Sequence, residues 1–130
     1  MFDSPLRAEA LILVSLGSVF GAYLRFSLIT LIQSKYIHSY LGVFFVNILA
    51  CFLLGFSISF LSNFNYLSFA NQLHLFFSIG FLGSFSTFSS YIFDVFSLFV
   101  DKKFKRGFAL LLLSIIVGII FASMGYLLGI

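Results

Sequence analysis

Apolar residues along the chain fall into four long stretches separated by short polar connections. A helix needs about 20 mostly apolar residues to cross the roughly 30 Å hydrocarbon core of a bilayer. The pattern therefore predicts four transmembrane helices, over residues of about 8–32, 41–62, 73–100 and 107–129. The expected fold is an all-α integral membrane protein, with one transmembrane domain that covers residues 1–130.

Composition supports lipid rather than water as the solvent. Hydrophobic residues make up 62% of the chain and charged residues 8%, and the mean hydropathy is +1.18. Soluble domains carry roughly 25% charged residues. No charged residue occurs between Tyr36 and Phe93. We expect a multi-pass protein of the cell membrane, either the inner or the plasma membrane.

Several classes of function find no support in the sequence. Cys51 is the single cysteine, and His38 and His74 lack the ligand spacing of a zinc site. Nothing pairs a nucleophile with a base, so we do not expect an enzyme. A basic stripe with interleaved aromatic residues on a soluble face is missing too, so no nucleic acid partner is expected.

Basic residues are divided unevenly between the two predicted sides of the membrane. The side with both termini carries Arg7 alone. The other side carries five basic residues: Lys35, Lys102, Lys103, Lys105 and Arg106. Because basic loops stay in the cytoplasm, this bias predicts one fixed topology with the termini outside.

Small residues recur at four-residue spacing in three of the predicted helices. Examples are Gly17 and Gly21 in the first helix and Cys51 and Gly55 in the second. The fourth helix continues the pattern with Ser114, Gly118 and Ala122. Such spacing lets helices approach closely in lipid.

The third predicted helix contains an unusual central run, from Gly80 to Tyr91. Its two glycines and five Ser or Thr residues do not suit a regular lipid-facing helix. Backbone groups freed at membrane depth are tolerated only inside protein or beside a water-filled path. We therefore predict a break near the midplane, where freed carbonyls can bind an ion.

The last part of this run contains two aromatic residues at a spacing of three, Phe88 and Tyr91. They share one helix face, which is open to two interpretations. Aromatic rings have electropositive edges, so they can line a narrow path for a small anion. The alternative is ordinary packing or lipid contact in a chain with 21 phenylalanines.

Two polar residues of the neighbouring helices are further candidates. Asn47 lies at mid-membrane, where an amide without a partner is costly, and it can donate two N–H bonds to an anion. Ser114 can supply another donor, or its hydroxyl can bond the carbonyl four residues earlier.

Arg25 and Asp94 are the ionisable residues that lie well inside the predicted spans. Each is costly alone in hydrocarbon. We expect structural roles for both, with Arg25 either reaching the interface or meeting Asp94 across the bundle.

Three blocks of the chain resemble the CrcB/Fluc family of fluoride channels, over essentially the full length. They are Gly21-Ala-Tyr-Leu-Arg25, Gly42-Val-Phe-Phe-Val-Asn47 together with Gly55, and the run from Gly80 to Tyr91. The resemblance implies a fluoride-selective channel that exports fluoride from a microbial cytoplasm. It also implies an antiparallel dimer with two fluoride pathways at its interface.

The resemblance assigns roles by position. It implies that Asn47, Phe88 and Tyr91 line the fluoride pathway, to which we add Ser89 and Ser114 as candidates. It implies a structural Na⁺ at the dimer centre, held by backbone carbonyls of Gly83 and Ser86.

Four residues depart from the family pattern. Ser84 replaces a glycine, Ser86 replaces a threonine, Tyr91 replaces a phenylalanine and Asp94 replaces a glutamate. The Tyr91 hydroxyl either narrows the path or adds a donor. The charge bias is a further departure, because an identical pair that inserts both ways needs nearly equal sides. It adds an alternative to the homodimer, namely an obligate heterodimer with a paralogous subunit in which this chain is inactive alone.

Two rival functions remain. A small proton-coupled exporter needs a titratable carboxylate in the first helix, where only Glu9 occurs, at the edge. A non-conducting scaffold predicts no ion flux and no effect of Asn47→Ala or Phe88→Ile.

Overall fold

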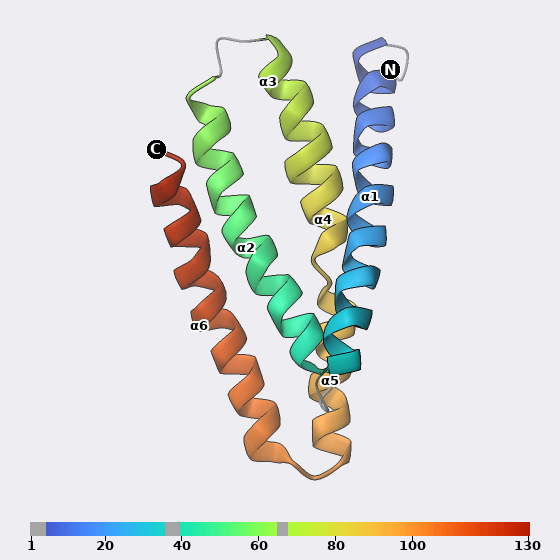
Figure 1. Cartoon of the computed structure of the whole chain (residues 1–130), viewed down its shortest axis with the longest axis vertical. Coiled ribbons are helices and arrows are strands. Elements are labelled where there is room, and N and C mark those ends of the chain that lie inside the picture. The colour runs from blue at the N-terminus through green and yellow to red at the C-terminus, as the bar shows by residue number, and fades with distance from the viewer. Residues whose placement is uncertain (1–4, 36–39, 65–67) are drawn as a thin grey trace.

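The computed structural model describes residues 5–35, 40–64 and 68–130, and within these ranges the chain is helical almost throughout (Figure 1). The helices are α1 (Pro5–Lys35), α2 (Tyr40–Ser62), α3 (Ser68–Leu73), η1 (His74–Phe81), α4 (Leu82–Phe85), α5 (Phe88–Val100) and α6 (Phe104–Leu128). Four spans are long and apolar enough to cross a membrane: 8–35, 40–62, 69–100 and 104–128. The four predicted spans are therefore confirmed. His38 lies outside the described residues, as does the side chain of Arg7.

The four spans run alternately up and down (Figure 1). The start of α1 and the end of α6 lie at one end of the subunit, and the connection between α5 and α6 lies at the other. The most extensive packing joins α2 to α6 and α1 to η1. The third span thus lies beside α1 over its first half.

Glycines bring α2 and α6 together at backbone distance. A Cβ atom on Gly55 would collide with the carbonyl oxygen of Ala122, and one on Gly125 would collide with that of Phe52. Any larger residue at these positions would force the helices apart. The small-residue spacing read from the sequence accordingly marks a helix–helix contact.

The same kind of contact joins α1 to the third span. A Cβ atom on Gly17 would meet the Phe76 carbonyl oxygen, and one on Gly21 would meet that of Phe81. Hydrogen bonds add to this packing, because the Ser84 hydroxyl donates to the Ser18 carbonyl at 2.8 Å. The first half of the third span is therefore fixed to α1.

The third span changes its geometry along its length. It begins as an α-helix, continues as the π-helical segment η1, tightens again into α4 and then stops at Phe85. Phe85 is fully buried and packs with Val46 and Leu82. The predicted interruption is present, two residues wide, before α5 resumes at Phe88. The π-helical segment was not predicted, because hydropathy does not distinguish the two helical registers.

Candidate functional site

The break in the third span consists of Ser86 and Thr87 in extended conformation. Their φ and ψ angles are −75° and 154° for Ser86 and −144° and 117° for Thr87. Thr87 is the N-cap of α5, since its side-chain oxygen accepts the Ser90 N–H at 3.3 Å. A hydroxyl residue at this position satisfies one of the donors that the start of a helix leaves unpaired.

Asn47 of α2 holds this extended segment through two hydrogen bonds. The Thr87 N–H donates to Asn47 Oδ1 at 2.9 Å, and Asn47 Nδ2 donates to the Thr87 carbonyl at 3.0 Å. Thr87 is buried, so neither backbone group can rely on water. The Asn47 amide, which was predicted to donate to an anion, therefore holds the broken segment in place through Thr87.

These bonds leave backbone carbonyls of the third span without their helical donors. In a continuous helix the Thr87 N–H would bond the Gly83 carbonyl and the Ser90 N–H would bond the Ser86 carbonyl. Here the two N–H groups go to Asn47 Oδ1 and to the Thr87 hydroxyl instead. Gly83 and Ser86 also line one small hollow of about 130 Å³. Carbonyl oxygens of this kind suit a hard cation such as Na⁺.

A metal site built from side chains is not found in the described part of the chain. Those residues contain no group of three or more His, Cys, Asp or Glu side chains placed to hold an ion. The oxygens present at the break belong to the backbone and to the Ser86 and Thr87 hydroxyls.

A cavity of about 310 Å³ opens beside the break. It gathers four of the residues predicted for the fluoride pathway, namely Asn47, Phe88, Tyr91 and Ser114. The remaining lining residues are Cys51, Ser86, Thr87 and Ile115. Residues from α2, the break, α5 and α6 thus meet at one place. We call this space the break cavity.

The two aromatic rings of the break cavity differ in their surroundings. Their centroids are 6.3 Å apart, and the rings are tilted by 45°. Phe88 is 76% exposed on the subunit, whereas Tyr91 is 9% exposed. The Tyr91 hydroxyl donates to the Leu111 carbonyl of α6 at 3.4 Å, so this donor is used inside the subunit.

The two serines predicted for the pathway behave differently from each other. The Ser114 hydroxyl donates to the Leu110 carbonyl at 2.6 Å, which is the bond to the preceding turn that we considered as its alternative role. Ser89 does not line the break cavity. It lies on the other side of the break, in a second hollow.

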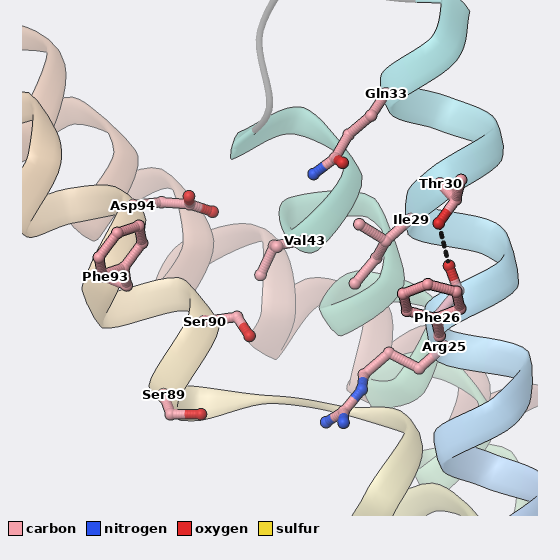
Figure 2. Close-up of a pocket in the computed structure, with 10 residues that line it drawn as sticks. All are labelled: Arg25, Phe26, Ile29, Thr30, Gln33, Val43, Ser89, Ser90, Phe93 and Asp94. Atoms are coloured by element: carbon pink, nitrogen blue, oxygen red, sulfur yellow. Dashed lines mark hydrogen bonds between the residues drawn. The ribbon is translucent and has the colours of Figure 1, made fainter.

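This second hollow has a volume of about 600 Å³ and lies between α1 and α5 (Figure 2). Its lining includes Arg25, Thr30, Gln33, Ser89, Ser90 and Asp94. Figure 2 shows the Arg25 side chain extending from α1 toward the segment that joins α4 to α5, with Asp94 across the hollow.

Arg25 and Asp94 share this hollow without forming an ion pair. Within the described ranges, the one ion pair joins Lys103 to Asp101, at 3.1 Å. The pairing considered from the sequence is therefore not present. One Asp94 carboxylate oxygen is buried and has no hydrogen-bond partner among the described residues. The reason is placement, because the two side chains face the hollow from opposite walls.

Three residues that line the break cavity were not predicted from the sequence, namely Thr87, Cys51 and Ile115. Cys51 was counted among the small residues at four-residue spacing, although it lies one turn after Asn47 and so shares its helix face. That spacing could have identified it. Thr87 carried no such signal, because its role depends on how far α2 lies from the break.

Four transmembrane helices, of which the third is broken, define a small polytopic membrane protein of the kind that moves ions or small solutes. Residues 12–126 match the family model described as CrcB-like protein, Camphor Resistance (CrcB). The chain belongs to this family.

Its relatives carry names that describe ion channels and not enzymes. A protein from Prochlorococcus marinus named fluoride-specific ion channel FluC 2 is 42% identical over 129 residues, covering 96% of this chain and 95% of that protein. The fluoride-specific ion channel FluC of Haemophilus ducreyi is 34% identical, covering 90% and 89%. The FluC protein of Thermosipho melanesiensis is 32% identical, covering 91% and 94%.

Proposed function

We propose that the chain forms a fluoride-selective channel that exports fluoride from the cytoplasm and lowers its concentration inside the cell. The names of relatives that match nearly the whole chain support this function. The observation that carries it here is the break cavity, where the Asn47 amide and the Phe88 and Tyr91 rings meet beside a broken helix.

In this proposal the break cavity forms part of the fluoride pathway. Among the described residues, Asn47 Nδ2 has one acceptor, Thr87, so its second N–H is available to an anion. The edges of the Phe88 and Tyr91 rings add weak positive potential without a full charge. Several weak contacts of this kind stabilise a small dehydrated anion and still let it leave, which conduction requires. Transport is then passive, down the fluoride gradient.

Ser114 and Ser89 take lesser parts in this pathway. Ser114 already donates to the preceding turn, so its hydroxyl oxygen faces the cavity mainly as an acceptor. Ser89 lines the second hollow together with Arg25, and we place that hollow at the approach to the break. Arg25 and Asp94 remain structural residues in the proposal.

A structural Na⁺ would be held by the Gly83 and Ser86 carbonyls, whose helical donors are diverted at the break. Its positive charge would fix the broken ends of the third span in place. A Cβ atom on Gly83 would meet nothing within 4 Å, so this side of the break is open to a neighbouring molecule.

The open side of the break supports a dimer, which we propose to be antiparallel. Phe88 is exposed on the single subunit, and a path lined on one side needs a second wall. The partner is either an identical chain or a paralogous subunit. The five-to-one charge bias makes a paralogous subunit of opposite bias the alternative to an identical chain.

The test is fluoride efflux from liposomes that contain the purified chain, followed with a fluoride electrode. Fast efflux of fluoride but not chloride is expected, and Phe88→Ile should abolish it. Phe96→Ile is the matched control, because Phe96 is an exposed ring on the same helix that lines neither hollow.

Three results would count against parts of the proposal. No efflux from folded protein alone, restored by a paralogous subunit, would identify the obligate heterodimer. Efflux that follows an imposed proton gradient would favour the coupled exporter. Equal flux in Phe88→Ile and wild type would remove the break cavity from the pathway.

A further inference from the structure

A further hollow lies between the starts of α2 and α6, away from the break. Its volume is about 260 Å³. The apolar part of its lining consists of Leu41 and Phe44 on α2 and Ala109, Leu110 and Leu113 on α6. Arg106 is the charged residue of the lining. We propose that this hollow binds an anionic phospholipid, with the Arg106 guanidinium on its phosphate.

The shape of the subunit explains why the hollow is open. The connection between α5 and α6 projects beyond the start of α2, so the first turns of α6 extend past their neighbour (Figure 1). Arg106, Leu110 and Leu113 are spaced at i, i+4 and i+7, which places them on one face of α6. The distance from Arg106 to Leu113 along the helix axis is about 10 Å.

The order of basic and apolar residues along α6 matches the order of headgroup and acyl chains in a phospholipid. The basic residue lies within the first turn of a membrane span, where headgroups are found. The apolar residues follow along the helix toward the bilayer interior, where the glycerol backbone and the upper acyl chains lie. An amphipathic lipid can thus occupy the hollow without placing a charge in hydrocarbon.

Charge at this end of the subunit favours an anionic headgroup. Four basic residues occur within five positions: Lys102, Lys103, Lys105 and Arg106. Lys103 is paired with Asp101 at 3.1 Å. Arg106 is exposed, and within the described ranges it has no carboxylate partner. Clusters of this size beside membrane helices attract anionic lipids, and a planar guanidinium binds a phosphate through two parallel hydrogen bonds.

The proposal is tested by native mass spectrometry of the purified protein, titrated with phosphatidylglycerol or with phosphatidylcholine of the same acyl chains. Wild type should retain phosphatidylglycerol in preference to phosphatidylcholine. Arg106→Gln should lower the apparent affinity of the protein for phosphatidylglycerol about tenfold. Lys105→Gln is the matched control, since it removes the same charge from the adjacent residue, which does not line the hollow. Its effect should be less than about twofold.

A second variant tests the apolar part of the site with every charge intact. Ala109→Phe fills the hollow, and it should also displace phosphatidylglycerol. Phosphatidylcholine, in which a cationic choline offsets the charge of the phosphate, should lose less affinity than phosphatidylglycerol in Arg106→Gln. None of these measurements depends on fluoride flux.

Three outcomes would overturn the proposal. Wild type without a preference for phosphatidylglycerol would remove the site. Equal losses in Arg106→Gln and Lys105→Gln would show diffuse attraction to the basic cluster. A dimer that dissociates in Ala109→Phe while lipid retention is unchanged would show that a second copy of the chain covers this face.

Discussion

Replacing Asn47 by alanine should loosen the break in the third span before it affects the rest of the fold. The amide of Asn47 donates to the Thr87 carbonyl at 3.0 Å and accepts the Thr87 N–H at 2.9 Å. Alanine removes both bonds and leaves two buried backbone groups without partners. The segment that separates α4 from α5 then has no side chain of α2 to hold it.

The size of the effect follows from these two bonds. A hydrogen bond contributes about 1 kcal/mol net, and bonds between membrane helices average about 0.6 kcal/mol with larger values where a buried group loses its partner. Two bonds to a buried residue therefore stabilise the closed break by about 2 kcal/mol. This corresponds to a roughly 30-fold increase in the local opening constant of the variant.

Hydrogen–deuterium exchange in detergent or nanodiscs measures this opening at the Thr87 amide. We expect exchange there to accelerate about 30-fold in Asn47→Ala, with little change in α6. Asn63→Ala is the control. Asn63 lies away from the break, beside the end of α6, and its amide donates to the Gly129 carbonyl at 3.1 Å. Unchanged exchange at Thr87 in Asn47→Ala would refute the claim that Asn47 holds the extended segment in place. So would equal acceleration in the Asn63 variant, which would indicate general loosening.

Two further predictions follow from contacts described above. Gly55→Ala should lower the free energy of unfolding in detergent by about 1–3 kcal/mol, because the new Cβ meets the Ala122 carbonyl oxygen. Gly118→Ala, whose new atom would meet Cys51 Sγ at an ordinary contact distance of 3.5 Å, should not lower it by more than about 0.5 kcal/mol, and circular dichroism measures both. Tyr91→Phe removes a long bond of 3.4 Å to Leu111 but keeps the ring, so fluoride efflux should stay within about threefold of wild type. A much larger drop in efflux would mean that the hydroxyl acts on the anion.

The helical plan could be predicted from the sequence because a bilayer permits few alternatives. Each span must satisfy its own backbone, so length and hydropathy are enough to locate it. The third span is the partial exception, since it begins at Ser68 rather than near residue 73. Polar residues there continue the helix beyond the apolar stretch, and hydropathy does not report them.

Four residues that line the break cavity, Asn47, Phe88, Tyr91 and Ser114, were selected from the sequence, but the contacts between them were not. Spacing along single helices placed Phe88 and Tyr91 on one face, and position in a span selected Asn47. The bond from Asn47 to Thr87 and the absence of an ion pair between Arg25 and Asp94 depend on distances between helices. The glycine contacts determine how closely the helices approach, and a sequence pattern does not specify that distance.

The two halves of the third span are anchored to different neighbours. Before the break, η1 and α4 pack against α1, and after it α5 packs mainly against α6. The break cavity lies next to the joint between these two halves, where Ser86 and Thr87 contribute to its lining. A bulkier residue at Gly17 or Gly21 would push the first half away from α1, and Ser86 and Thr87 would transmit that shift to the cavity. Tuning of ion passage in this subunit can accordingly arise from α1, which contributes no residue to the break cavity.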